Sequence, residues 1–298
     1  MPSMHELKDK VAVVTGGGSG IGRGICEALA AEGAHVMVAD VESAKAESVA
    51  ASLRERGADA QAQVADVSSL DSVKRLADAT IAAFGGVDVV CNNAGVYLNG
   101  SVRELTPDDW RWVMSVNLDG VYHGCRVFVP LLLERGAGHI MNTASLGGLL
   151  PSSSAYSASK AAVVSYSEIL RADLADDDIG VSCLCPGAVR TDLALCDRLR
   201  PETLADAGNH SAVLAASIEN GISPEEAGAI AVRGIQRNAA FIFTDTNGYA
   251  AVQARFARIL DAMTAGREVG FLPQLMAVGD AVLLPSPASE LDVYETDQ

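Results

Sequence analysis

The sequence predicts an α/β protein with a three-layer, doubly wound fold around a seven-stranded parallel sheet, and three observations lead to that prediction. Apolar, strand-like runs alternate along the chain with segments whose apolar residues have helical spacing. The strand-like runs are continuously apolar, which is typical of parallel strands that helices cover on both faces. A glycine-rich turn, TGGGSGIG at 15–22, joins the first run to the first helical segment. Right-handed crossovers between such strands place helices on both sides of one sheet.

Each predicted element follows from a local pattern. The first strand is VAVVTG, and the helical spacing after it ends at Gly33, which favours a helix stop. Thr106 is the expected N-cap of a later helix, with Pro107 and two acidic residues in its first turn. The predicted strands are 11–16, 35–40, 60–66, 87–95, 139–145, 180–187 and 239–245. The predicted helices are 20–33, 43–57, 69–84, 106–133, 155–175 and 248–263.

The length of 298 residues suits one large domain, which we place at 1–270. Within it, the stretch 192–225 breaks the alternation of strands and helices, because it mixes leucines with polar residues and has no strong period. The remaining segment, 271–298, contains proline and ends in acidic residues, so we expect it to be a C-terminal tail on the surface.

Composition limits the partners and the location of the protein. The chain has 22 Lys and Arg against 38 Asp and Glu, a net charge of −16, which disfavours nucleic acid and anionic membranes as partners. The same charge has the simpler interpretation of a soluble surface. No apolar run approaches roughly 18 residues, and the charged N-terminus has no apolar signal core. The six cysteines form no CxxC pair, and the histidines do not cluster, so we expect reduced thiols, no metal site and a cytoplasmic location.

The glycine-rich turn is typical of dinucleotide binding. Gly16, Gly20 and Gly22 allow a sharp turn and bring backbone N–H groups to a diphosphate at the start of the helix. An ordinary strand–helix turn is the alternative. Asp40 ends the second predicted strand, where a carboxylate accepts hydrogen bonds from both ribose hydroxyls of NAD and repels the 2′-phosphate of NADP. Asp40 therefore favours NAD over NADP, although a capping role for it is the alternative.

Tyr156 and Lys160 lie four positions apart in the small-residue run SAYSASKAA, so a helix places them on one face. A nearby ammonium favours the phenolate, and we expect it to lower the pKa of Tyr156 toward 7, which makes the phenol a competent acid and base. Ser145 ends a predicted strand eleven residues upstream, at the sheet edge where doubly wound folds bind ligands. A Tyr–Lys pair at this spacing is usually structural, and Ser145 also suits a capping role.

Taken together, the motifs resemble those of the short-chain dehydrogenase/reductase family, with its NAD(P)-binding Rossmann fold. The matching pieces are TGGGSGIG, Asp40, the DV of 66–67, NNAG at 92–95, Asn117 in SVNLDG, Ser145 in NTAS, YSASK at 156–160 and PGAVRT at 186–191. The resemblance covers about 10–192. It implies a homodimer through the long helices at 107–133 and 155–175, or a homotetramer.

The resemblance also implies roles for individual residues. Tyr156 would be the general acid and base, Lys160 would bind the nicotinamide ribose, Ser145 would orient the substrate oxygen, and Asn117 would hold a water in a proton relay. The implied cofactor-binding residues are Gly16, Ser19, Gly20, Ile21, Gly22, Asp40, Val41, Asp66, Val67, Asn93, Ala94, Gly95, Tyr156, Lys160, Pro186, Gly187, Val189 and Thr191. For Asn92 and Asn93, satisfaction of turn backbone is the structural alternative.

The sequence departs from the family pattern in three places. The gap between Ser145 and Tyr156 is about two residues shorter than usual, the usual Asp-Gly-Gly segment that helps tetramers form is replaced by TDTNG, and the stretch 192–225 is long. The last feature resembles relatives with extended lids that act on bulky, often aromatic, secondary alcohols, and this resemblance implies a substrate lid at about 192–225.

The leading functional hypothesis is therefore an NAD-dependent alcohol dehydrogenase or ketone reductase with a small-molecule substrate. Ser145, Tyr156, Leu149 and Leu193 are the predicted substrate residues. An apolar pocket would also include Leu150, Leu195 and Leu199, with Tyr97 and Trp110 within reach. The alternative is a non-catalytic NAD-binding sensor or scaffold. A sugar-nucleotide epimerase or dehydratase is disfavoured, because the only basic residues near the lid are Arg190, Arg198 and Arg200.

Overall fold

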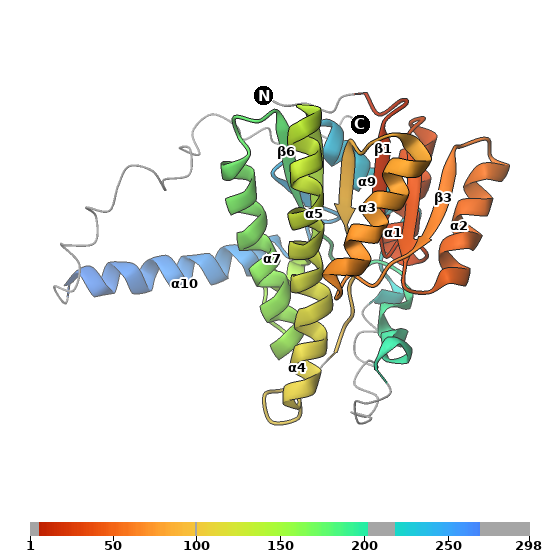
Figure 1. The fold of residues 1–298 in the computed structure, drawn as a ribbon. Coiled ribbons are helices and arrows are strands. Elements are labelled where there is room, and N and C mark those ends of the chain that lie inside the picture. The colour runs from red at the N-terminus through yellow and green to blue at the C-terminus, as the bar shows by residue number, and fades with distance from the viewer. Residues whose placement is uncertain (1–5, 99, 202–217, 269–298) are drawn as a thin grey trace. The chain divides into compact units, whose positions relative to one another are not determined.

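A seven-stranded, fully parallel sheet forms the centre of the protein, as the sequence predicts (Figure 1). The computed structural model describes residues 6–98, 100–201 and 218–268. The strand order is β3-β2-β1-β4-β5-β6-β7, so the direction of winding reverses between β1 and β4, where doubly wound folds form a ligand crevice. The strands are β1 Val11–Thr15, β2 His35–Asp40, β3 Ala60–Val64, β4 Val89–Asn92, β5 Gly138–Thr143, β6 Ile179–Cys185 and β7 Phe241–Phe243.

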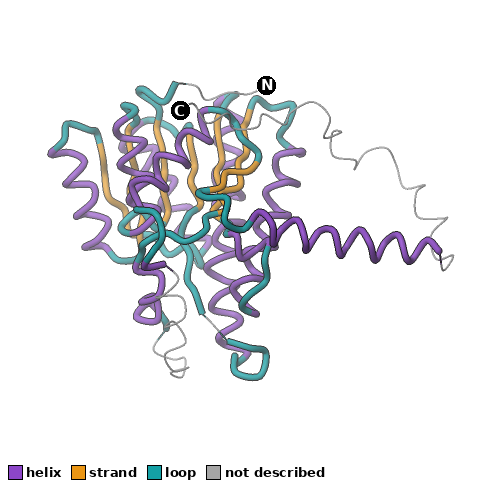
Figure 2. The backbone as a smooth tube through the Cα atoms, turned by 180° about the vertical axis from the view of Figure 1, so that it is seen from behind, coloured by secondary structure: helices purple, strands orange, loops and turns teal. Residues whose placement is uncertain are grey.

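Helices cover both faces of this sheet (Figures 1 and 2). The helices of the first compact unit, Met1–Ala250, are α1 Gly20–Ala31, α2 Ser43–Glu55, α3 Leu70–Phe84, α4 Pro107–Met114, α5 Gly120–Arg135, α6 Leu146–Leu149, α7 Ser154–Asp173 and α9 Pro224–Gln236. A π-helical turn, η1 Ser115–Asp119, joins α4 to α5, and a 3₁₀ helix, η2 Asp192–Leu199, follows β6. The helix α10, Tyr249–Glu268, runs from the end of this unit into a second one, Ala251–Gln298.

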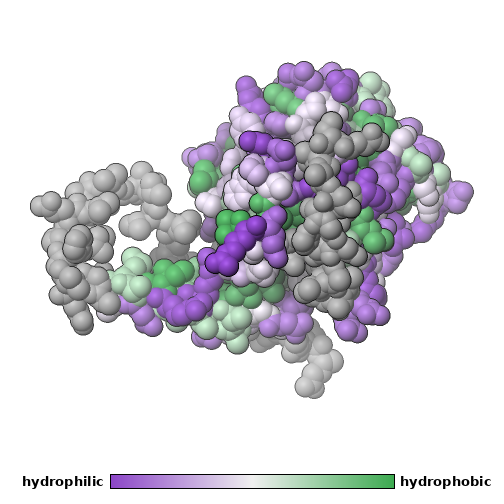
Figure 3. All heavy atoms as spheres, turned by 90° about the horizontal axis from the view of Figure 1, so that it is seen from below, coloured by the Kyte–Doolittle hydropathy of each residue, from purple (hydrophilic) through white to green (hydrophobic). Residues whose placement is uncertain are grey.

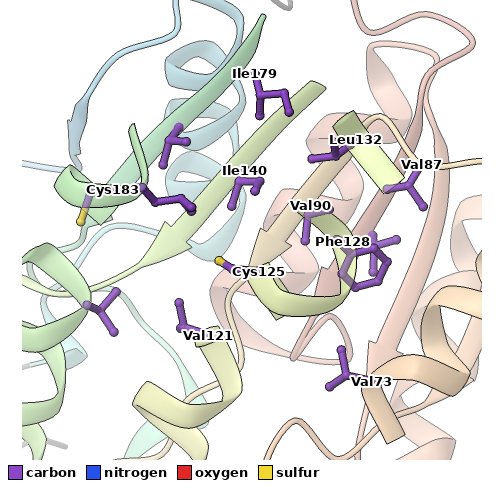
Figure 4. Packing of buried hydrophobic residues seen from close by; sticks show 14 of the residues in the cluster. Val73, Val87, Val90, Val121, Cys125, Phe128, Leu132, Ile140, Ile179 and Cys183 are labelled. Carbon is purple, nitrogen blue, oxygen red and sulfur yellow. The ribbon is translucent and has the colours of Figure 1, made fainter. Parts of the chain in front are cut away.

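The core consists of two apolar layers, one on each face of the sheet. On one face, Val90 and Ile140 pack among Val121, Phe128 and other side chains of α3, α5 and α7 (Figure 4). On the other face, alternate strand residues pack against α1, α2 and α9. Strands that are apolar at every position therefore bury both of their faces, which explains the continuous pattern in the sequence.

The helix α9 was not predicted, although its start has a clear local signal. Ser223 caps it, and Glu226 completes a capping box, with Pro224 in the first turn. The helix packs closely on α1, because a Cβ added at Gly24 would lie only 1.9 Å from the backbone oxygen of Pro224. The predicted lid at 192–225 therefore overlaps the start of a core helix. Its residues 202–217, like the predicted tail 271–298, lie outside the described residues.

Two further predicted boundaries differ from the structure. The predicted strand 87–95 ends at Asn92, and the predicted single helix 106–133 is interrupted by η1. Thr106 is the N-cap of α4, as predicted, in a capping box with Asp109. Asn117 lies in η1, where the backbone departs from regular α-helical geometry. Its side chain hydrogen-bonds the backbone N–H and oxygen of Val96. The two deviations therefore meet at one point, beside the ends of the strands.

Hydrophilic residues dominate the face of the molecule seen from below Figure 1, with small hydrophobic patches between them (Figure 3). Within the described ranges, no helix combines the length and apolar character needed to cross a bilayer.

Candidate active site

A cleft of about 1040 Å³ lies at the carboxyl ends of the strands. It is lined by the loops after β1 to β6 and by residues of α4 and η2. All of the predicted cofactor-binding residues line it, and so do Ser145 and Leu193. Its volume is just above the roughly 300–1,000 Å³ that small-molecule pockets usually occupy.

The glycine-rich turn forms one wall of the cleft. Gly16 has a φ of +63°, and a Cβ at Gly22 would lie 2.0 Å from the backbone oxygen of Gly16. The helix α1 begins at Gly20, and Ser19 caps it by backbone geometry without a side-chain cap bond. A chain with any Cβ at Gly22 could not pack this tightly, so the turn exposes backbone N–H groups to the cleft at a positive helix end.

Asp40 holds this turn in place from the end of β2. Its Oδ2 accepts a hydrogen bond from the backbone N–H of Gly18 at 3.0 Å, and its Oδ1 accepts one from that of Glu42 at 2.9 Å. The residue is 7% exposed and lines the cleft. The capping alternative is thus partly realised, because Asp40 stabilises the loop after β2, while the same carboxylate also faces the ligand space.

The junction of β1 and β4 is held by side-chain to backbone bonds. The hydroxyl of Thr15 accepts from the backbone N–H groups of Asn93 and Ala94, at 3.0 and 3.1 Å, and Asn93 Nδ2 donates to the Thr15 oxygen at 3.0 Å. Asn92 is buried and donates to Asn142 Oδ1 at 2.9 Å. Both asparagines therefore have the structural role that sequence reasoning left open.

Further along the cleft, the loop after β3 turns around Asp66. The Asp66 carboxylate accepts from the Ser68 backbone and hydroxyl, and His123 Nδ1 lies 2.8 Å from the Val67 oxygen. These bonds fix the loop at the edge of the cleft.

Three of the four predicted catalytic residues, Ser145, Tyr156 and Lys160, meet at the floor of the cleft. Ser145 follows β5 in extended backbone geometry and hydrogen-bonds the Tyr156 side chain, although the segment between them is short. Lys160 Nζ donates to the Thr143 oxygen at 2.7 Å and lies 5.9 Å from the centre of the Tyr156 ring. Asn117 does not line the cleft itself; it bonds the Val96 backbone and its Nδ2 donates to Ser159 Oγ at 3.1 Å.

The pKa of Tyr156 differs from the expectation. Burial raises it to about 12, and the hydrogen bond from Ser145 offsets only part of that increase. Burial also lowers the pKa of Lys160 to about 8. Desolvation of the charged form is the larger effect for both side chains, and the ammonium is directed to Thr143. The expected lowering of the Tyr156 pKa toward 7 is therefore wrong for this geometry, in which the phenol is a protonated acid at neutral pH.

The substrate end of the cleft is formed by large side chains, and only part of it was predicted. Tyr97 is 9% exposed and packs edge-on against Tyr156, with the ring centres 4.8 Å apart. Leu150, Leu193 and Leu199 also line the cleft. Three other predicted residues do not: Leu149 packs on the core, Leu195 is 63% exposed and Trp110 is 44% exposed.

Trp112 and Cys196 line this end and were missed by sequence reasoning. Trp112 is two residues after Trp110, hence on the other face of α4. The capping box that starts α4, together with buried Val113, is the signal that could have set this phase. Cys196 packs against Tyr97, with its Sγ 3.1 Å from the Tyr97 nitrogen.

The three arginines near the predicted lid are all engaged. Arg190 donates to the Gly221 oxygen, Arg198 pairs with Glu42, and Arg200 pairs with Asp109. Arg111, at the rim, pairs with Asp108. All six cysteines are buried free thiols.

Comparisons with known proteins agree with this architecture. The family model described as short chain dehydrogenase matches residues 10–199. The chain is 34% identical over 269 residues to the C alpha-dehydrogenase of Sphingobium sp. (strain NBRC 103272 / SYK-6), covering 87% of this chain and 88% of that protein. The fold is similar to a short chain dehydrogenase/reductase from Burkholderia phymatum in complex with NAD, with a TM-score of 0.83, 38% identity, and 86% and 96% of the two chains covered. It is also similar to the apo form of LigD from Sphingobium sp. strain SYK-6, with a TM-score of 0.73, 31% identity, and 86% and 97% covered.

Proposed function

The chain belongs to the short-chain dehydrogenase family, and we propose that it is an NAD-dependent oxidoreductase acting on a bulky or aromatic secondary alcohol or the corresponding ketone. The observation that carries this proposal is the meeting of Ser145, Tyr156 and Lys160 on the floor of the cleft, beside the glycine-rich turn. A site that only bound a dinucleotide would not need a buried phenol hydrogen-bonded to a serine at its floor.

The residues present fit a dinucleotide. The space next to Gly16 and Gly22 is bounded by backbone, that next to Gly20 is bounded by the Thr191 side chain, and the N-terminus of α1 opens into the cleft. When bound, NAD supplies or accepts the hydride. Asp66 and Val67 would lie along the adenine, and the segment from Pro186 to Thr191 would hold the nicotinamide carboxamide. Asp40, whose carboxylate lines the cleft and pairs with no arginine among the residues that the structure describes, favours NAD over NADP.

We assign the proton chemistry to Tyr156. With a pKa raised to about 12, the phenol donates a proton to the oxygen of a ketone as that oxygen gains negative charge. Ser145, bonded to the phenol, orients the same oxygen. Lys160 holds a positive charge near the ring, and Asn117 joins the floor to the loop 93–98 through Val96. In the oxidative direction the phenol must lose its proton first.

The substrate end supports a bulky apolar substrate. Tyr97, Trp112 and the cleft-lining leucines present aromatic and aliphatic walls, and the nearby cations are paired with acids. The name of the 34% identical relative, C alpha-dehydrogenase, supports a dehydrogenation at a Cα carbon. We further propose that the protein forms a homodimer through α5 and α7, on which the side chains of Tyr122, Leu133 and Ile169 are exposed. We also propose a cytoplasmic location.

Reduction of aryl ketones by NADH, followed by loss of NADH absorbance, tests the proposal. Tyr156→Phe should lower kcat/KM by about 10²- to 10⁴-fold with NADH binding retained, because only the proton donor is removed. Tyr166→Phe is the matched control, since Tyr166 lies on the same helix and does not line the cleft. If the unchanged protein binds NADH and turns over no alcohol or ketone, it is a sensor or scaffold. If the Tyr156→Phe variant reduced aryl ketones as fast as the parent protein, the proposed role of Tyr156 as proton donor would be wrong.

A further inference from the structure

The segment 192–201, which we call the strap, crosses the cleft. It consists of η2 and the two residues after it, and it contributes Leu193, Cys196 and Leu199 to the cleft wall. Two of its arginines, Arg198 and Arg200, have acidic partners far apart in the sequence. The partner of Arg198 is in the loop after β2, next to Asp40, and the partner of Arg200 is in α4. These two ion pairs, which we call the ties, hold the strap at two places. The Arg198–Glu42 pair lies at the adenosine rim of the cleft, and the Arg200–Asp109 pair lies at the substrate rim.

The tie at the adenosine rim is exposed. Arg198 Nη2 lies 2.7 Å from Glu42 Oε2, and the two side chains are 35% and 29% exposed. Lys45 also pairs with Glu42, at 2.9 Å, so the carboxylate retains a partner when Arg198 leaves. The pKa of Glu42 is lowered, chiefly by Arg198. Exposed pairs of this kind are weak and are screened by salt, so this tie opens easily.

The tie at the substrate rim is buried. Asp109 has no exposure and the Arg200 side chain is 9% exposed. The second oxygen of Asp109 accepts two bonds from Thr106, each at 2.8 Å, and the Arg200 guanidinium lies 5.7 Å from the centre of the Trp112 ring. Opening this tie would leave a buried charge without its partner, which is strongly unfavourable.

We propose that the strap is released at one rim of the cleft only and that its two arginines have different positioning roles. Arg200 is the fixed anchor that places Leu193, Cys196 and Leu199 over the substrate. Arg198 closes the adenosine rim behind the dinucleotide, and the Arg198–Glu42 pair must break before the dinucleotide leaves. This inference rests on the proposed function, because it assigns the two rims to a dinucleotide and a substrate.

The first arm of the test measures NADH release without substrate, by stopped-flow displacement with energy transfer from the two tryptophans to NADH. Arg198→Gln and Glu42→Gln should each speed release about two- to fivefold and should remove most of its salt dependence. The double variant should behave like either single one. Arg54→Gln is the control, because Arg54 is in an exposed pair with Glu47 on α2 and does not line the cleft.

The second arm measures KM for an aryl ketone. Arg200→Gln should raise KM at least tenfold and leave the NADH release rate within twofold of the parent, because the anchor acts on the substrate roof. Arg200→Lys retains the charge and should recover part of the KM, and it replaces Arg200→Gln as the test variant if the latter does not fold.

Three outcomes would overturn the inference: release from Arg198→Gln at the parental rate, an Arg200→Lys or Arg200→Gln protein with parental KM, or variants at both rims that change the same parameter. The result also separates the inference from the proposed function. A protein that binds NADH but reduces no ketone contradicts the proposed function, while the release arm still decides whether Arg198 closes the adenosine rim.

Discussion

The dinucleotide end and the substrate end of the cleft are formed by different kinds of groups. At the dinucleotide end, backbone groups and short side chains held by the sheet form the wall: Gly16, Gly22 and Asp40. At the substrate end, Tyr97 and large side chains of α4 and the strap do so. The first end is fixed by the ends of strands, and the second by helix phase and contacts between distant segments.

The tolerance of the two ends to change should differ accordingly. A Cβ at Gly22 would lie 2.0 Å from backbone, which cannot move without disturbing β1 and α1. A Cβ at Gly147, nearer the substrate end, would meet the Ser145 hydroxyl at 3.3 Å and the Tyr156 ring at 3.4 Å, where small side-chain adjustments suffice. Substitutions at the dinucleotide end and the floor should therefore change catalytic rate or dinucleotide binding more than substitutions in the substrate walls change KM.

The largest effect should come from Lys160→Met at the floor. Removing the ammonium removes the charge beside Tyr156 and the bond to Thr143, so kcat/KM for ketone reduction should fall about 10²- to 10⁴-fold. Steady-state rates with NADH measure this. Lys74→Met is the control, since Lys74 is exposed on α3 and pairs with Asp71. A fall in kcat/KM of less than tenfold would mean that proton transfer by Tyr156 does not depend on the Lys160 ammonium.

Replacing the charge at the end of β2 should change the choice of dinucleotide. Asp40→Asn retains an oxygen that can accept from the Gly18 N–H but removes the negative charge, so binding of NADPH relative to NADH should improve about 10- to 100-fold. Titration of both dinucleotides by fluorescence measures the ratio. A parent protein that already prefers NADPH would contradict the role given to Asp40.

The rate of ketone reduction should fall about tenfold per pH unit above pH 8. The pKa of Lys160 is lowered to about 8 by burial, so its charge is present below that pH and is lost above it. Tyr156, with a pKa raised to about 12, stays protonated through this range and adds no second limb. The Lys160→Met variant should be slow but flat across pH 8. A falling limb that persists in this variant would belong to another group.

The fold and the floor could be predicted because local signals determine them. Continuous apolar strands fix the parallel sheet, and motif residues at strand ends arrive at one edge of it, as Ser145 and Asp40 do. The pKa of Tyr156 could not be predicted, because desolvation depends on burial by segments distant in sequence. The helical face shared by Tyr156 and Lys160 brought them together, but it did not reveal that Thr143 would take the ammonium bond.

The substrate end could be predicted less well for a related reason. Leu150 lines the cleft while Leu149 packs on the core, and nothing in the run LGGLLP distinguishes them. The ties of the strap join residues such as Glu42 and Arg198, which are 156 positions apart. The start of α9 was missed although its capping box is visible in the sequence, so that omission was avoidable.

The smallest effect should come from the aromatic wall, where Tyr97 and Trp112 line the cleft and Trp110 does not. Tyr97→Leu removes an aromatic surface that packs on Tyr156, so KM for an aryl ketone should rise about three- to tenfold while NADH binding is unchanged. Trp110→Leu should change neither, because Trp110 is 44% exposed and faces away from the cleft that Trp112 lines. Cyclohexyl and phenyl ketones of equal chain length should separate loss of ring contact from loss of volume, since only the phenyl substrate should lose affinity. If Tyr97→Leu lowered kcat as strongly as Lys160→Met does, the wall and the floor would act as one unit, and the contrast between the two ends of the cleft would not hold.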